Sequence, residues 1–305
     1  MISKLITVFT PTYNRKQKLV DCYNSLKNQS DQQFVWQIID DGSDDGTEEL
    51  VSQWQIISDI DIEYYKVPNG GKCRAINKSL SLTTTPLWVC LDSDDVLTEN
   101  AIDIIAQEYM SIKDDDSICG IFSLRGQDGI SSMQGVSIPR DLKQSTQRHI
   151  RYNLGIPPEY AHVFKTNIAR NFTYPSIEGE SYFPLSYVFD QIDEIYKYKV
   201  LHKSIMICEY RKDGITKNKR KLIVKNPRGY TMYKKQLVGM APTKKERYKA
   251  VATYITGCIL SKSNPFENND FKILTLLLYP VGLADYLLRY RYQINIDLEI
   301  KTKNI

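Results

Sequence analysis

The segment 92–95 reads Asp-Ser-Asp-Asp and directly follows the apolar run 87–91. A short apolar run of this kind predicts a buried strand, so the three carboxylates lie where the strand emerges into water. In open α/β sheets ligands bind outside the carboxyl ends of the strands, and carboxylate oxygens suit Mg²⁺ or Mn²⁺ that carries phosphate groups. We therefore expect a divalent cation here. The alternative is a polar turn that caps a helix beginning near Thr98.

The elements before this segment alternate in a regular order. The predicted strands are 4–10, 34–39, 62–67 and 87–91, and the predicted helices are about 15–28, 46–57 and 72–82. This alternation predicts a mainly parallel sheet covered by helices. A further helix is expected from Thr98, as its N-cap, to Met110, followed by a strand over 119–122.

The first two predicted strands end in residues that suit a nucleotide. The first ends in Thr-Pro-Thr-Tyr-Asn-Arg at 10–15, where Pro11 forces an extended exit and leaves Tyr13 to stack on a base. The second ends in Asp-Asp-Gly-Ser at 40–43, where an Asp can accept a hydrogen bond from a base or ribose. Each motif by itself is also typical of an ordinary turn before a helix.

The third strand ends in Pro-Asn-Gly-Gly-Lys-Cys-Arg-Ala-Ile-Asn at 68–77. The glycine pair opens a helix whose first turn carries Lys72 and Arg74, and amides at a helix N-terminus together with cations favour a diphosphate. The segment matches neither GxxxxGK[ST] nor GxGxxG, which argues against a P-loop NTPase or a dinucleotide-binding protein.

Taken in order, TPTYNR, DDGS, NGGKCRAIN and LDSDD resemble the motifs of the family 2 glycosyltransferases, closely over about 3–110 and more loosely over 160–225. The resemblance implies an α/β GT-A fold, with a mainly parallel central sheet flanked by helices. It implies an enzyme that transfers a sugar, with inversion, from a nucleotide-sugar, expected to be a UDP-sugar.

Carried over position by position, the resemblance assigns roles to individual residues. The nucleotide-sugar is expected to contact Pro11, Tyr13, Arg15, Asp41, Lys72, Arg74 and Asp92. Asp94 becomes the principal ligand of Mg²⁺ or Mn²⁺, and Asp92 touches ribose or metal. Asp95 joins the metal or holds the donor sugar and the acceptor.

An inverting transfer needs a carboxylate that takes the proton of the acceptor hydroxyl. Many family members carry an ED pair for this purpose, whereas this chain has Glu178-Gly-Glu180-Ser at the corresponding place. Glu180 is the preferred candidate for the base and Glu178 the second. If the pair aligns instead with 185–186, neither carboxylate is present, and 178–180 is then a surface loop.

A strongly basic segment follows. Residues 211–228 hold eight Lys or Arg against one Asp, although the whole chain carries only +4. Such a strip can serve phosphates, anionic lipid or nucleic acid, or can be a solvated loop. Because 210–216 resembles a Y-x-x-DG-[LI]-T stretch of some family members, we expect a loop that closes over the donor diphosphate, and no nucleic acid.

The chain is long enough for one large domain with appendages. We expect a catalytic domain over 1–228, divided into a nucleotide-binding part at 1–122 and an acceptor-side part with the basic loop at 123–228. A helical extension follows at 229–305. Within it, the apolar stretch 271–292 contains Pro280 and Asp285, so it is a poor membrane-spanning candidate and is expected to lie at a membrane surface or to pack on protein.

The six cysteines show no metal-binding spacing, which predicts reduced and mostly buried thiols, and the first 30 residues do not read as a signal peptide. We therefore expect a cytoplasmic enzyme, with peripheral attachment to the inner face of the plasma membrane as one alternative. It would transfer sugar to a hydroxyl of a glycan or lipid-linked acceptor in cell-surface polysaccharide synthesis. Rival hypotheses are a sugar-1-phosphate nucleotidyltransferase and an inactive nucleotide-sugar-binding scaffold.

Overall fold

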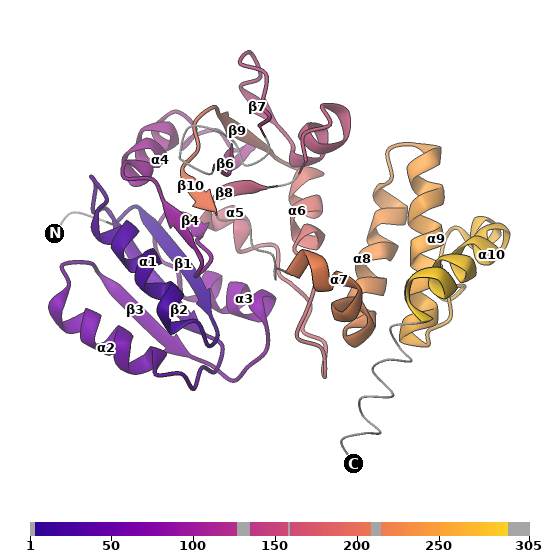
Figure 1. The fold of residues 1–305 in the computed structure, drawn as a ribbon. Coiled ribbons are helices and arrows are strands. Elements are labelled where there is room, and N and C mark those ends of the chain that lie inside the picture. The colour runs from indigo at the N-terminus through magenta and orange to yellow at the C-terminus, as the bar shows by residue number, and fades with distance from the viewer. Residues whose placement is uncertain (1–3, 127–134, 158, 209–214, 292–305) are drawn as a thin grey trace. The chain divides into compact units, whose positions relative to one another are not determined.

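The computed structural model describes residues 4–126, 135–157, 159–208 and 215–291, and its chain forms two compact units (Figure 1). The sheet unit comprises residues 1–174 and 188–210, and the helical unit comprises 175–187 and 211–305. The units therefore divide the chain at points other than residue 228. One reason is that 175–187 contacts residues after 225, where the side-chain oxygen of Asn226 accepts from the amides of Ser181 and Tyr182.

The sheet unit is built on an eight-stranded sheet of order β3-β2-β1-β4-β8-β6-β9-β7. Its strands are β1 (Ile6–Thr12), β2 (Phe34–Asp40), β3 (Ile62–Lys66), β4 (Leu87–Cys90), β6 (Ile118–Leu124), β7 (Gln144–Ser145), β8 (Tyr160–Lys165) and β9 (Lys197–Leu201). Strands β1 to β4 are parallel, and β4 and β6 are both antiparallel to β8. The carboxyl ends of β1 to β4 and of β6 therefore share one edge.

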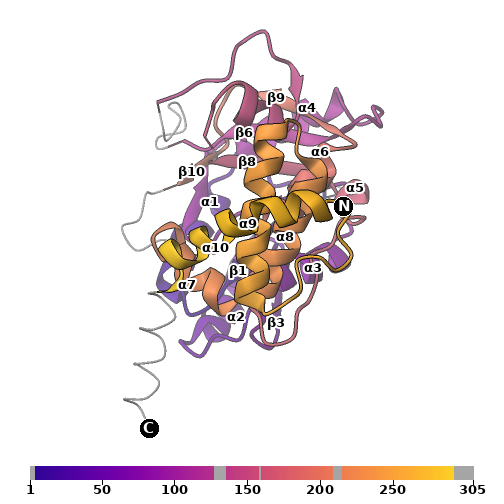
Figure 2. The same cartoon turned by 90° about the vertical axis from the view of Figure 1, so that its right-hand side faces the viewer.

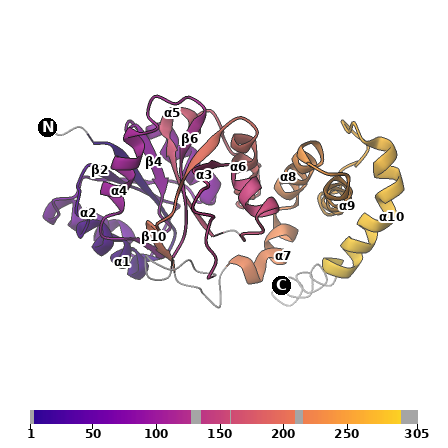
Figure 3. The same cartoon turned by 90° about the horizontal axis from the view of Figure 1, so that it is seen from above.

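Helices cover both faces of this sheet (Figure 3). They are α1 (Lys16–Lys27), α2 (Thr47–Ile57), α3 (Lys72–Leu82), α4 (Ala101–Met110), the short α5 (Thr166–Ala169), a π-helical turn (His149–Asn153) and α6 (Ser186–Asp193). All seven residues of β2 are buried, as expected for a central strand. Its Trp36 lies in a ring cluster with Tyr23 and Trp54, which stack at 4.3 Å.

The predicted strands and helices of residues 4–110 are confirmed, with one correction. Helix α4 begins at Ala101 with Asn100 as its N-cap, so the prediction of Thr98 as N-cap was wrong. A short strand, β5 (Asp95–Leu97), pairs antiparallel with β10 (Met206–Cys208) and occupies the chain just before that point. The Thr98 amide is thereby bonded to the Ile205 carbonyl, and the helix starts later.

The helical unit contains α7 (Ile215–Lys225), α8 (Pro227–Met240), α9 (Lys244–Ser261) and α10 (Lys272–Arg289), of which α8 to α10 face the viewer in Figure 2. Ala250, Tyr254 and Cys258, which follow one another at four-residue intervals along α9, are all buried. A capping box of Thr243 and Glu246 begins this helix. Among the described helices, none is long and apolar enough to cross a membrane.

Of the six cysteines, all are free and five are buried. The prediction of reduced, mostly buried thiols agrees with this arrangement. Cys90, at the end of β4, is the one with intermediate exposure.

Candidate active site

The loops that follow β1 and β2 are tied together at the shared edge of the sheet. Asn14 adopts a left-handed φ of 50°, and its side chain accepts a hydrogen bond from the Asp44 amide at 2.9 Å. Its own amide donates to Ser43 Oγ at 2.9 Å. The preceding Tyr13 is half exposed, and its stacking on a base remains a prediction.

Asp41 joins the second loop to the third. Its two carboxylate oxygens accept hydrogen bonds from the amides of Gly70 and Gly71, at 2.7 and 2.8 Å. Burial raises the pKa of Asp41, while the two amide donors act in the opposite direction. Gly71 has a φ of 87°, which only glycine adopts readily, so the loop geometry depends on this residue.

Close backbone contact also fixes the position of Gly42. A Cβ at this residue would lie 3.3 Å from the amide nitrogen of Asn69, and its φ of 89° again favours glycine. Arg74, in the first turn of α3, folds over Gly70, where a Cβ would meet Arg74 Cδ at 2.6 Å. The glycine loop is therefore held between Asp41 and a cation.

The carboxylates after β4 are paired with cations from three other places. Lys72 forms an ion pair with Asp92, and Arg15 Nη1 lies 3.0 Å from Asp94 Oδ2. Burial alone would raise the pKa of Asp92, but the charges of Lys72 and Arg125 lower it below its usual value. Burial likewise opposes the charge of Lys72, and Asp92 more than offsets it, so the pKa of Lys72 is raised.

Arg125 also lies at this edge, and the sequence did not predict it as a site residue. It follows β6, and its Nη1 donates to Asp95 Oδ2 at 2.8 Å, while its Nη2 lies 3.9 Å from Asp92 Oδ2. Its Nε donates to the Tyr160 carbonyl at 3.0 Å. Only a weak indication of this position for Arg125 is present in the sequence. The direction of β6 depends on the antiparallel β8, which comes later in the chain.

Asp95 is more enclosed than its neighbour Asp94, with side-chain exposures of 8% and 21%. Burial raises the pKa of Asp95 to about 6, although Arg125 acts in the opposite direction. Asp94 is therefore the better placed of the two to meet a ligand from solvent.

The carboxylates at this edge fit a hard divalent cation that takes only part of its ligands from the protein. Within the described ranges, no group of three or more His, Cys, Asp or Glu side chains is arranged to hold a metal. Mg²⁺ is commonly held by one or two carboxylates and completed by substrate phosphates and water. Asp94 and Asp92 provide such a partial set beside two basic side chains, Arg15 and Lys72.

The predicted base lies in the helical unit. Glu180 Oε1 accepts from the Arg228 amide and Oε2 from the Gly229 amide, each at 2.8 Å. Glu180 thereby stabilises the N-terminus of α8, and its side chain is only 5% exposed. Glu178 is exposed, and its carbonyl oxygen accepts from the guanidinium of Arg228.

The assignment of Glu180, or of Glu178, as the catalytic base therefore remains a prediction. The motif at 210–216 has residues 210–214 outside the described ranges, so its expected closure over the diphosphate also remains a prediction.

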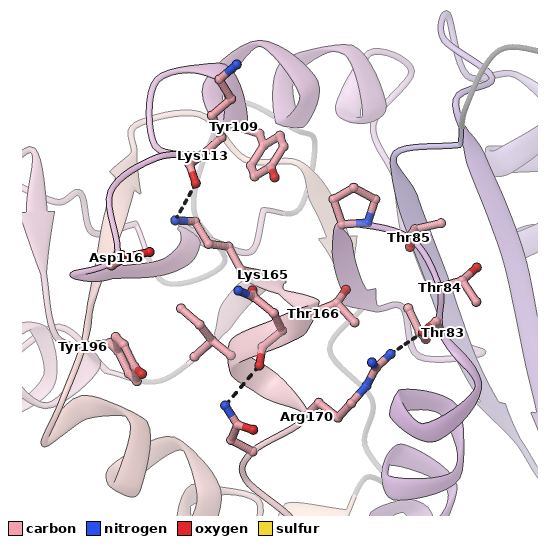
Figure 4. Close-up of a pocket in the computed structure, with 14 residues that line it drawn as sticks. Thr83, Thr84, Thr85, Tyr109, Lys113, Asp116, Lys165, Thr166, Arg170 and Tyr196 are labelled. Atoms are coloured by element: carbon pink, nitrogen blue, oxygen red, sulfur yellow. Dashed lines mark hydrogen bonds between the residues drawn. The ribbon is translucent and has the colours of Figure 1, made fainter.

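A polar cavity of about 650 Å³ lies at the other edge of the sheet, where β4 begins (Figure 4). Lys165 and Arg170 line it, but they are bonded to backbone carbonyls, including those of Asp115 and Leu80. Ligands of open α/β sheets bind at the carboxyl ends of strands, so the Asp92–Asp95 edge is the candidate active site.

Comparison with known proteins identifies the family of the chain. Residues 7–172, more than half of the chain, match the family described as "Glycosyl transferase family 2". The chain belongs to that family. The match covers β1 to β4, and so every strand-end motif of the site.

Curated relatives include "Glycosyltransferase GlyG" of Streptococcus pneumoniae, 29% identical over 119 residues, which are 39% of each chain. Another is "Putative teichuronic acid biosynthesis glycosyltransferase TuaG" of Bacillus subtilis, 30% identical over 138 residues, or 45% of this chain and 54% of that one. The match thus spans only about two fifths to one half of these relatives.

Solved structures extend the likeness of fold over nearly the whole chain. Staphylococcus aureus TarS 1-349 in complex with UDP-GlcNAc has a TM-score of 0.58 at 16% identity, covering 96% of this chain and 83% of that one. The mannosyltransferase PcManGT of Pyrobaculum calidifontis, in complex with GDP-Man and Mn²⁺, has a TM-score of 0.54 at 15% identity, with 94% and 88% covered. The predicted GT-A fold is confirmed.

Proposed function

We propose that this chain is an inverting, metal-dependent glycosyltransferase that moves a sugar from a nucleotide-sugar to a hydroxyl of a glycan or lipid-linked acceptor. The donor is proposed to be a UDP-sugar and the pathway to be cell-surface polysaccharide synthesis. The observation that carries the proposal is the meeting of Arg15, Lys72 and Arg125 with the carboxylates of Asp92, Asp94 and Asp95 at one sheet edge.

On the donor side, the first three loops bind the nucleotide. The ring of Tyr13 stacks on the base, while Asp41 keeps the glycine loop close and presents its carboxylate to a base or ribose donor. Lys72 and Arg74, in the first turn of α3, face the diphosphate. The same turn brings the charge of Lys72 beside Asp92.

A Mg²⁺ or Mn²⁺ ion held by Asp94 and Asp92 would neutralise negative charge on the departing nucleoside diphosphate. Arg15 and Lys72, now paired with these carboxylates, are positioned to turn toward the phosphate oxygens when the donor binds. The PcManGT complex contains Mn²⁺, which supports a divalent cation in this fold.

On the acceptor side, we assign the proton-accepting role to Glu180, with Glu178 as the second candidate. Each carboxylate oxygen of Glu180 accepts one hydrogen bond from a backbone amide and keeps a further lone pair that could accept from an acceptor hydroxyl. We place the reaction in the cytoplasm, at the inner face of the plasma membrane, because a lipid-linked acceptor would be found there.

The experiment supplies purified protein with UDP- and GDP-sugars, Mg²⁺ or Mn²⁺ and candidate acceptors, and measures release of the nucleoside diphosphate. We expect release that depends on metal and acceptor, and a loss of at least about a hundredfold in Asp94→Asn. Asp44→Asn is the matched control, since Asp44 is an exposed aspartate of a neighbouring loop.

Nucleotide binding without turnover on any acceptor would instead favour a nucleotide-sugar-binding scaffold. Formation of a nucleotide-sugar from a sugar-1-phosphate would favour a nucleotidyltransferase. Equal activity of Asp94→Asn and Asp44→Asn would contradict the metal assignment.

A further inference from the structure

Helix α10 turns its most apolar side to solvent. Ile273, Leu276, Leu277, Val281, Leu287 and Leu288 are 79%, 64%, 69%, 52%, 42% and 84% exposed. Their three- and four-residue spacing aligns them along one side of the helix, which we call the α10 stripe. A continuous exposed apolar surface of this kind indicates an interaction site.

The side of α10 that packs on α9 is mixed, because Leu274 and Leu278 pack on the buried cluster of α8 and α9 and polar residues lie beside them. Asp285 accepts from Thr256 of α9 at 2.9 Å and pairs with Arg289 at 2.8 Å. Thr275 is also buried. At Gly282, α10 approaches α9 so closely that a Cβ would lie 2.6 Å from Ile255 Cβ.

These contacts fix the rotation of α10 about its axis. Rolling the α10 stripe inward would break the buried bonds of Asp285 and force larger side chains against Ile255. The exposure of the stripe is therefore built into the packing of the helical unit.

The net positive charge of the helical unit indicates which kind of surface the α10 stripe contacts. The helical unit holds 20 Lys and Arg against nine Asp and Glu, a net +11, so the sheet unit carries −7 of the total of +4. Exposed Lys219, Arg220 and Lys221 lie on α7. Helix α7 adjoins the C-terminal end of α10, because Ile223 clusters with Tyr290 and Tyr286 (Figure 3).

We infer that the α10 stripe and the exposed cations of α7, which are Lys219, Arg220 and Lys221, together dock on an anionic lipid surface. In this arrangement α10 lies flat in the interface. Interfacial helices combine an apolar side with neighbouring basic residues, and each Lys or Arg near an anionic surface strengthens binding about fivefold. A second copy of the chain would bring the same +11 charge to the stripe, and that repulsion disfavours a dimer.

The test is sedimentation of the full chain with vesicles of phosphatidylcholine alone or mixed with phosphatidylglycerol, at low and high salt. We expect binding to the mixed vesicles, weaker binding to the neutral ones, and loss of the difference at high salt because surface charges are screened. Equal binding to both vesicle types at low salt would overturn the anionic-lipid inference.

The double variant Leu277→Gln and Leu288→Gln should lower binding to mixed vesicles about tenfold or more. The matched control is Ile56→Gln and Ile57→Gln on α2 of the sheet unit, where the two isoleucines are 84% and 74% exposed. Lys219→Gln with Lys221→Gln should reduce binding to the mixed vesicles only. Thermal unfolding followed by circular dichroism checks that each variant is folded.

Two further outcomes would overturn the inference. One is that the Leu277→Gln and Leu288→Gln variant binds the mixed vesicles as strongly as the parent chain. The other is a dimer, seen by sedimentation equilibrium without vesicle binding and abolished by that variant, which would assign the stripe to a second copy. Vesicle binding requires neither donor nor acceptor, so it is scored independently of nucleoside diphosphate release and of the proposed function.

Discussion

The guanidinium of Arg125 donates a hydrogen bond to the carboxylate of Asp95 across 2.8 Å, although 30 residues separate them in the chain. The same guanidinium is anchored to the carbonyl of Tyr160 at the start of β8. Arg125 therefore sets the position of the carboxylates after β4 from a strand that is not adjacent to β4. We regard it as a positioning residue.

Arg125→Lys should keep a positive charge but lose the rigid fork that reaches Asp95 and Tyr160 together. We expect kcat to fall about a hundredfold, with a smaller change in the donor KM, because misplacement acts mainly on the reacting geometry. The measurement is steady-state kinetics over a range of Mg²⁺ and Mn²⁺ concentrations.

Arg148→Lys serves as the control for this change, because Arg148 is a largely buried arginine of the sheet unit that pairs with Glu194. A purely structural role for Arg125 would lower the stability of both variants and leave the metal dependence of catalysis unchanged. That result would contradict the positioning role.

Asp41→Ala should leave the amides of Gly70 and Gly71 without their acceptor. An unpaired buried amide costs about 1 to 3 kcal/mol, so the glycine loop should shift and the donor KM should rise at least about tenfold. Isothermal titration with nucleoside diphosphate measures the effect directly. Asp59→Ala, at an exposed aspartate, should bind the nucleotide as the parent does.

Glu180→Gln tests the acceptor-side assignment. If Glu180 takes the proton, kcat should fall about a hundred- to ten-thousandfold while nucleotide affinity stays near that of the parent. A small loss of stability, about 1 kcal/mol, should accompany it, because a charge is removed from the N-terminus of α8.

Glu178→Gln supplies the comparison, since Glu178 is exposed and two residues away. A large kinetic effect in Glu178→Gln alone would move the role to that residue. Full activity in both variants would leave Glu180 as a helix-capping residue only.

The stability of the sheet unit should depend on pH through Asp193. Burial raises the pKa of Asp193 to about 7 from 3.8, even though it accepts from the amides of Gln147 and Arg148. The folded state then holds a proton that the unfolded chain releases, so this group's stabilisation is greatest at low pH and is lost as the pH rises toward 7.

The measurement is urea unfolding at pH 5 and at pH 7.5. In Asp193→Asn, the stability difference between the two values should shrink by on the order of 2 kcal/mol relative to the parent. Asp103→Asn, on α4, controls for the general effect of removing a carboxylate. An unchanged difference in Asp193→Asn would contradict the raised pKa.

The part of the candidate site that lies directly after β1 to β4 could be predicted from the local sequence. Motifs such as Asp41-Gly42 and Gly71-Lys72 lie directly after apolar strands, so the parallel rhythm of the first four strands brings them to one edge. Arg125 could not be placed in this way. Its strand runs parallel to β4 only because the antiparallel β8 lies between them, and that pairing joins residues distant in sequence.

Glu180 illustrates a different limit. The resemblance to the ED pair of family members suggested Glu180 as a base, but its two amide partners come from Arg228 and Gly229, 48 and 49 residues further on. A motif predicts which chemical group is present, whereas the hydrogen bonds of that group depend on how distant segments pack. The start of α4 was misplaced for the same reason, since β5 pairs with the distant β10.

The orientation of helix α10, with Asp285 facing α9, affects how well the chain stays in solution. A helix optimised for stability in water would expose its aspartate and bury more of its leucines, whereas α10 bonds Asp285 to Thr256 and leaves several leucines exposed. Replacing the exposed leucines by polar residues should therefore give a chain that is easier to keep in solution at high concentration.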